Sequence, residues 1–291
     1  MSVRFGSEVP LILSPFKLGK SQAIPLMQYF PDFIKAIFSG FVEGITEFLP
    51  VSSTAHLLIF SWLVDFNSIQ NNLFEIVIQF GAILAVIIIY RVRIFSLILE
   101  WRKKNNQKLI LNLFLSFLPA AFIGLLFHDF IKKVLFSNFV IACALIFGGL
   151  AMLVIDRKER KFEITNIDEV SPIKAFFIGC FQSMAIIPGI SRSGATIIGG
   201  LLLKLNRQTA AEFSFFLSIP TIAAATFYDL YKNYQVLTLS GFELIIVGFL
   251  SAFISAILVI KWFISYISKH NFISFAIYRI ALGVLILFFI L

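Results

Sequence analysis

Long apolar segments alternate with short polar ones along most of this 291-residue chain. Segments with few charges that approach or exceed ~17 residues are typical of transmembrane helices, because that length crosses the hydrocarbon core of a bilayer. Six such segments are present: 74–90, 110–127, 139–155, 212–229, 242–262 and 273–290. We therefore predict an all-α polytopic membrane protein with six transmembrane helices.

Two further apolar stretches, 33–64 and 173–203, are interrupted by proline and then by a turn rich in hydroxyl groups. Pro50 and Pro188 lack an amide hydrogen and disfavour helical geometry at the residue before them. Each stretch therefore predicts a re-entrant helix–turn–helix hairpin, with hydroxyl residues capping the second helix. Irregular backbone at membrane depth is tolerated only where it is buried in protein or lines a wet cavity, so the hairpins also indicate a site.

The two halves of the chain resemble each other weakly. Laying Ser52 on Ser191 without a gap also aligns Glu43 with Gln182. Three predicted spans follow each hairpin, so the second unit enters the bilayer from the opposite face, as in inverted-topology repeats whose broken helices form a binding site near the midplane. We predict an irregular or interfacial tail at 1–32 and a single membrane domain at 33–291, with repeat one at 33–155 and repeat two at 173–290.

Composition and charge agree with this interpretation. Hydrophobic residues make up 59% of the chain, against about 45–50% in ordinary soluble domains. The net charge of +8 comes from basic residues concentrated in the loops 91–109, 156–172 and 204–211. The positive-inside rule places those loops in the cytoplasm, and both chain ends then lie outside. We expect no nucleic-acid partner, and the sequence leaves the oligomeric state open, a homodimer included.

The first hairpin carries two acids within apolar sequence. Glu43 and Glu47 are four residues apart, so on a helix both carboxylates project from one face. Oxygen ligands of this kind bind Mg²⁺ or Ca²⁺ alongside a substrate phosphate. The alternative is a pair of acids bonded to neighbouring helix ends.

Anion-binding features follow each break. Residues 52–54 all bear hydroxyl groups, and a helix that starts there offers free amides and a favourable dipole to a phosphate. In the second hairpin, Arg192 lies between Ser191 and Ser193, and its guanidinium can grip a phosphate at two points. The structural alternative is an arginine paired with one of the glutamates.

His56 lies one helical turn after the hydroxyl residues, where its imidazole could move a proton. A metal site, an anion cradle, an arginine and a proton-transfer group are the recurring parts of phosphoryl transfer. No Walker loop or HExxH motif is present. A transporter that uses the same anion pocket is the competing hypothesis. A purely structural scaffold would leave the intramembrane charges without purpose.

Two segments resemble the motifs of the bacterial undecaprenyl-diphosphate phosphatase family of the bacitracin-resistance type. Residues 43–56 match EGxTEFLPVSSTxH and residues 188–196 match PGxSRSGxT, both completely and in the expected order. The resemblance implies hydrolysis of undecaprenyl diphosphate to undecaprenyl phosphate and inorganic phosphate. It implies that this reaction recycles the lipid carrier for peptidoglycan synthesis and confers bacitracin resistance. It further implies the bacterial cytoplasmic membrane, a pocket open to the outer side, and a divalent cation, Mg²⁺ or Ca²⁺.

The resemblance also implies roles for individual residues. Glu43 and Glu47 would serve the metal and the acid/base chemistry, and Arg192 would clamp the phosphate. Ser53 would be the nucleophile or a phosphate ligand, and His56 its proton-transfer partner. Water could instead attack directly, with His56 or Glu47 as its base. The other residues expected to line the phosphate site are Ser52, Thr54, Gly189, Ser191, Ser193 and Thr196.

Overall fold

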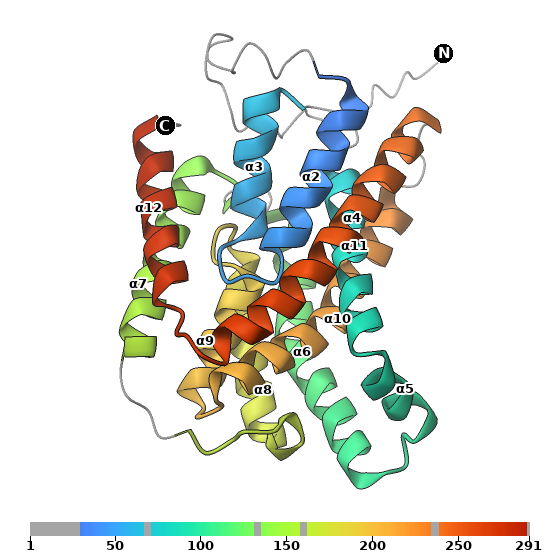
Figure 1. The fold of residues 1–291 in the computed structure, drawn as a ribbon, viewed down its shortest axis with the longest axis vertical. Coiled ribbons are helices and arrows are strands. Elements are labelled where there is room, and N and C mark those ends of the chain that lie inside the picture. The colour runs from blue at the N-terminus through green and yellow to red at the C-terminus, as the bar shows by residue number, and fades with distance from the viewer. Residues whose placement is uncertain (1–29, 67–70, 131–134, 158–161, 234–238, 290–291) are drawn as a thin grey trace, which may run out of the picture.

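The computed structural model describes residues 30–66, 71–130, 135–157, 162–233 and 239–289, and their regular structure is helical (Figure 1). A single bridge between Ile164 and Leu205 is the exception within these ranges. The prediction of an all-α chain is therefore confirmed for the described residues. Residues 1–29, most of the expected N-terminal tail, lie outside them.

The helices are labelled as in Figure 1. The first half contains α2 (Asp32–Thr46), α3 (Ser53–Val64), α4 (Asn71–Ile89), α5 (Arg91–Leu99), α6 (Lys104–Phe130) and α7 (Asn138–Arg157). The second half contains η2 (Ile167–Glu169), α8 (Pro172–Ser183), η3 (Met184–Ile186), α9 (Arg192–Leu202), α10 (Arg207–Asn233), α11 (Leu239–Ile267) and α12 (Ile273–Phe289).

Helical hairpins occupy both of the proline-broken stretches. In the first, α2 ends at Thr46 and α3 begins at Ser53, so the turn begins before Pro50. In the second, α8 and η3 end before Pro188, and α9 begins at Arg192. The α2–α3 pair and the α8–α9 pair extend toward opposite ends of the molecule, and their turns meet near its middle (Figure 1). Their tips are therefore placed to form one shared site.

Each hairpin packs closely on a long helix of the other half. A methyl group added at Gly40 of α2 would lie 2.1 Å from the carbonyl oxygen of Gly248 in α11. One added at Gly179 of α8 would lie 2.4 Å from the carbonyl oxygen of Ser116 in α6. Small residues permit such backbone contact between helices in membranes. In both helix pairs, therefore, a glycine in the hairpin of one half lets its backbone contact the backbone of a long helix from the other half.

Unusual backbone conformations also occur in matching pairs. Ser52 and Ser191, the N-caps of α3 and α9, have φ values of 74° and 72°. Asp65 and Lys204, at the ends of the same two helices, have φ values of 50° and 72°. Residues other than glycine rarely adopt positive φ. The alignment that lays Ser52 on Ser191 also lays Asp65 on Lys204, so the weak sequence similarity corresponds to similar local backbone.

The described helices include four that are long and apolar enough to cross a membrane, namely α6, α7, α10 and α11. The bent pair α4 and α5 raises this number to five if it counts as one span. The last predicted span corresponds to α12, which is apolar and has 17 residues in the described part of the chain. Each of the six predicted segments therefore falls on a helix, and length and composition identify a multi-pass membrane protein.

The helix α5 was not expected from the sequence. The chain turns by 80° between α4 and α5, so part of the predicted basic loop 91–109 is helical. Arg93 of α5 forms an ion pair with Asp168 in the loop after α7, and Lys204 forms one with Glu163. Three of the loops predicted to be cytoplasmic thus contact one another at one end of the molecule.

Candidate active site

The two hairpin turns are joined at the centre of the molecule by side-chain contacts. The hydroxyl of Ser193 donates a hydrogen bond of 2.8 Å to the carbonyl of Leu49 in the first turn. Arg279 of α12 is fully buried. It donates to the carbonyls of Pro50, Ala144, Gly189 and Ile190. One guanidinium therefore connects both turns to α7 and α12.

Beside this junction, Glu47 receives hydrogen bonds from both hairpins. Its Oε2 accepts a bond of 2.7 Å from the Ser53 hydroxyl, and its Oε1 lies 3.0 Å from Nη2 of Arg192. Both members of the Glu47–Arg192 ion pair are nearly buried, with side-chain exposures of 7% and 12%. The structure thus brings the acid of one hairpin and the arginine of the other into direct contact. The same ion pair is expected if Arg192 has only the structural role of pairing with one of the glutamates.

The orientation of Arg192 is fixed by a small hydrogen-bonded group. Its Nη1 donates to the carbonyl and hydroxyl of Ser214 in α10, at 2.8 and 3.2 Å. Thr196 donates a bond of 2.7 Å to the same Ser214 hydroxyl. The buried Nε of Arg192 has no hydrogen-bond partner among the described residues. One buried donor of the guanidinium is therefore left unsatisfied among the described residues.

Glu43 is buried one turn before Glu47, and neither of its carboxylate oxygens has a hydrogen-bond partner within the described ranges. Glu47 and Glu75 of α4 act on it with like charge, and Arg192 acts on it with opposite charge. An unpaired buried carboxylate is strongly unfavourable unless a cation or proton compensates it.

No cluster of three or more His, Cys, Asp or Glu side chains that could hold a metal occurs among the described residues. Two acids alone still match Mg²⁺, which commonly takes one or two carboxylates plus substrate phosphates.

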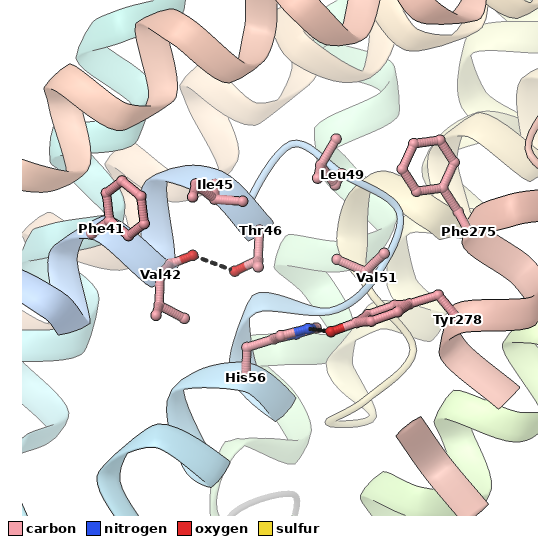
Figure 2. Close-up of a pocket in the computed structure, with 9 residues that line it drawn as sticks. All are labelled: Phe41, Val42, Ile45, Thr46, Leu49, Val51, His56, Phe275 and Tyr278. Carbon is pink, nitrogen blue, oxygen red and sulfur yellow. Dashed lines mark hydrogen bonds between the residues drawn. The ribbon is translucent and has the colours of Figure 1, made fainter. Parts of the chain in front are cut away.

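His56 makes its contacts away from Ser53. Its Nδ1 lies 2.7 Å from the carbonyl oxygen of Ser52, and its Nε2 lies 2.7 Å from the hydroxyl of Tyr278 (Figure 2). A carbonyl only accepts, so Nδ1 carries the hydrogen and Nε2 of the neutral ring accepts from Tyr278. In the structure, therefore, Glu47 and not His56 accepts the hydrogen bond from the Ser53 hydroxyl.

The remaining predicted phosphate-site residues lie at the two turns or at the helix starts that follow them. Ser191 caps α9, since its hydroxyl accepts a bond of 3.1 Å from the amide of Gly194. Ser52 is the buried N-cap of α3, and Thr54 lies in the first turn of that helix. Gly189 has φ of 96°, and its carbonyl faces Arg279.

Three contributing residues were given no role by the sequence. A charged residue within an apolar helix is a signal that could have identified Arg279 from the sequence. Its partners could not be identified in this way, because they come from segments distant in the chain. Tyr278 and Ser214 carry no comparable signal, because an aromatic or a serine in a transmembrane helix is common. Only the contacts of His56 and Arg192 identify them.

Comparison with known proteins agrees with the motifs. A family model described as bacitracin resistance protein BacA matches residues 36–285. A protein of Methylobacillus flagellatus named undecaprenyl-diphosphatase is 50% identical over 259 residues, covering 87% of this chain and 96% of that protein. Relatives of the same name from Nitrosomonas eutropha and Parvibaculum lavamentivorans are 48% and 45% identical. These two alignments cover 87% and 89% of this chain, and 93% and 97% of those proteins.

Proposed function

This chain belongs to the bacitracin resistance protein BacA family, and we propose that it is a membrane phosphatase that hydrolyses undecaprenyl diphosphate. The products are undecaprenyl phosphate and inorganic phosphate. We further propose that it acts in the bacterial cytoplasmic membrane, recycles the carrier for peptidoglycan synthesis and thereby confers bacitracin resistance. The relatives named undecaprenyl-diphosphatase support the activity.

One geometric observation supports this function most directly. Glu47 contacts a hydroxyl from its own hairpin and a guanidinium from the other, at 2.7 and 3.0 Å. We assign Ser53 as the nucleophile, Glu47 as the acceptor of its proton, and Arg192 as the group that neutralises charge on the phosphate. Positioning and charge neutralisation supply most of the catalysis in phosphoryl transfer. A carrier needs no hydroxyl paired with a base, so the contact favours hydrolysis over transport.

His56 is proposed to act on the leaving group. Its Nε2 faces Tyr278, on the opposite side of the ring from the Ser52 carbonyl. In the proposed reaction the bridging oxygen between the two phosphorus atoms replaces the Tyr278 hydroxyl at this nitrogen, and the protonated ring donates to it. As the Ser53 oxygen attacks the terminal phosphorus, the bond from that phosphorus to the bridging oxygen breaks, and the lipid monophosphate leaves on the side of His56. Water would then hydrolyse the phosphate ester of Ser53, which releases inorganic phosphate and restores the serine hydroxyl.

Glu43 and Glu47 are the residues proposed to hold Mg²⁺ or Ca²⁺. The bound cation would neutralise phosphate charge and orient the diphosphate. The unpartnered oxygens of Glu43 support this assignment, because a cation would compensate their buried charge.

The proposed membrane arrangement has six spans (α4, α6, α7, α10, α11 and α12) and two re-entrant hairpins related as an inverted repeat. The opposed hairpins and the matching positive φ values of Ser52 and Ser191 support it. The basic loops would lie in the cytoplasm, and the active site would open to the outer side.

Removal of the divalent cation is expected to abolish phosphate release. Purified protein should liberate inorganic phosphate from a polyprenyl diphosphate, lose this activity in a chelator, and regain it when Mg²⁺ or Ca²⁺ is added in excess. The measurement is inorganic phosphate release over time, with unfolding temperature as a control for integrity. Full activity in the chelator would reject the metal, and no release under any condition would reject the phosphatase.

Glu47→Gln is expected to lower kcat by about 100-fold, because the neutral amide cannot accept the Ser53 proton or pair with Arg192. The cation concentration required for half activation should also rise. Glu243→Gln, an exposed change on α11, is the matched control and should leave both quantities unchanged. An unaltered cation titration in Glu47→Gln would move the metal elsewhere.

A further inference from the structure

The short helix α5 presents an apolar face at the surface of the molecule. Four of its apolar side chains are between 60% and 78% exposed, namely Val92, Phe95, Ile98 and Leu99. Positions 92, 95 and 99 follow helical spacing, so these side chains lie on one face of the helix. Trp101, just after the helix, is also exposed. A contiguous apolar face of this kind indicates contact with lipid or with another molecule.

The opposite face of α5 is fixed to the body of the protein. Leu97 is buried in the largest apolar core. Arg93 forms an ion pair with Asp168, and its Nη1 donates a bond of 3.0 Å to Asn106 of α6. Asn106 in turn donates a bond of 2.9 Å to the carbonyl of Ser96. The helix therefore cannot turn its apolar face inward without breaking these contacts.

Positive charge surrounds the exposed apolar face. The segment 91–104 contains five basic residues and one acid. Its exposed basic residues are Arg91, Arg102, Lys103 and Lys104. The acid, Glu100, pairs with Lys103 at 2.8 Å. The guanidinium carbon of Arg102 lies 5.4 Å from the centre of the Trp101 ring, a distance typical of a cation–π contact. Hydrocarbon and positive charge are thus presented side by side.

The helix lies where a membrane span ends. The chain turns by 80° between α4 and α5, so α5 runs across the direction of that span. It lies toward the end of the molecule at which α6 and α8 begin (Figure 1). An amphipathic helix in this position lies in the plane of the interface, with its apolar side chains among acyl chains and its basic ones near lipid phosphates. Tryptophan is also enriched at this depth.

An anionic lipid matches both features of this segment. It carries a negative phosphate group directly beside hydrocarbon, so one molecule can contact the apolar face and the basic residues together. The cytoplasmic leaflet is negatively charged and attracts basic segments next to membrane spans. A second copy of this chain that used the same segment would bring like charge into the contact, which disfavours it.

We propose that the segment 91–104, the interfacial segment, binds anionic phospholipids of the cytoplasmic leaflet. Phe95 and Leu99 insert among the acyl chains, and Arg102, Lys103 and Lys104 contact the lipid phosphate groups. Bound lipid anchors the end of α4 at the membrane surface. This binding is separate from hydrolysis and takes from the proposed function only the cytoplasmic placement of the basic loops.

Quenching of Trp101 fluorescence tests the preference for anionic lipid. The protein is placed in phosphatidylcholine nanodiscs with increasing fractions of brominated phosphatidylglycerol or brominated phosphatidylcholine, and the signal of Trp101→Phe is subtracted. We expect phosphatidylglycerol to bind about fivefold more tightly or better, which is the effect of one basic residue near an anionic surface. The triple variant Arg102→Gln/Lys103→Gln/Lys104→Gln should reduce this preference to less than about twofold.

Lys232→Gln is the control for the charge change. It removes an exposed positive charge from the far end of α10 and should leave the lipid preference at Trp101 unaltered. Equal quenching by the two lipids in the unaltered protein would overturn the inference, and so would the absence of quenching by both. These outcomes do not depend on phosphate release, so the test stands even if the phosphatase is rejected.

Cysteine reactivity in native membranes tests whether lipid covers the apolar face. Val92 and Lys103 have similarly exposed side chains in the structure, at 78% and 65%. A hydrophilic maleimide should modify Lys103→Cys readily and Val92→Cys about tenfold more slowly, because a thiol in apolar surroundings reacts poorly. The parent protein, with Cys143 and Cys180, gives the background. Equal rates, or disulfide-linked dimers of Val92→Cys, would overturn the inference, since water or a second copy would then occupy the face.

Discussion

Arg192→Lys is expected to lower kcat/KM for a polyprenyl diphosphate by about 1,000-fold, within the range seen when an arginine that stabilises phosphoryl transfer is removed. The guanidinium contacts Glu47 and Ser214 through its two terminal nitrogens, and its buried Nε has no hydrogen-bond partner among the described residues. A lysine offers a compact point charge in place of this planar set of donors. It would retain the charge but could not contact Glu47, Ser214 and a phosphate in the same geometry.

The measurement for Arg192→Lys is steady-state phosphate release at saturating cation. Arg102→Lys, which changes an exposed arginine in the loop after α5, controls for the substitution itself and should stay within about twofold. The unfolding temperature should change little, because lysine keeps a positive charge beside Glu47. Near-normal turnover would show that Arg192 has only the structural role of pairing with Glu47.

Arg279→Met is expected to give the largest loss of stability, about 3–5 kcal/mol, together with loss of activity. The side chain donates to four carbonyls: those of Pro50, Ala144, Gly189 and Ile190. The carbonyls of Pro50, Gly189 and Ile190 lie in the turns and would lose their donor, at a cost of about 1–3 kcal/mol for each one left unsatisfied, and relief of arginine desolvation offsets part of that sum. Two of these carbonyls belong to the second turn and one to the first, so the turns would also lose their alignment.

Thermal unfolding in detergent and phosphate release measure the two effects of Arg279→Met. Lys261→Met removes an exposed positive charge from α11 and should leave both measurements unchanged. Arg279→Lys should be intermediate, since it restores a charge and some of the donors. If Arg279→Met is as stable and active as the parent protein, the two turns are held by other contacts.

Local sequence was sufficient to predict the elements that carry the candidate site. Proline breaks and hydroxyl caps predicted hairpins at 33–64 and 173–203, and the structure has hairpins there, although each first helix ends a few residues before its proline. The apolar segments predicted helices, and each falls on one. The spacing of Glu43 and Glu47 predicted neighbouring carboxylates. These features depend on backbone chemistry and helical periodicity within a few residues, and a single sequence contains that information.

The partners of the site residues depended on contacts between distant parts of the chain. The sequence left open whether Arg192 pairs with an acid, and the structure pairs it with Glu47. It suggested His56 as the partner of Ser53, whereas Glu47 contacts Ser53 and Tyr278 contacts His56. Helical spacing favoured His56, which lies one turn after Ser53 on the same helix, whereas the fold of the turn between α2 and α3 brings Glu47 back onto the hydroxyl.

The sequence by itself determined that this protein is helical, belongs in a membrane, and carries acids, hydroxyls and an arginine at two broken helices. The tertiary structure alone decided that α4 bends into α5, that Arg279 joins the two turns, and that Tyr278 contacts His56. The physical reason is the range of the interactions. Capping, periodicity and proline breaks act between near neighbours, whereas the contacts of Arg279 and Tyr278 join turns and helices far apart in the chain that only packing brings together.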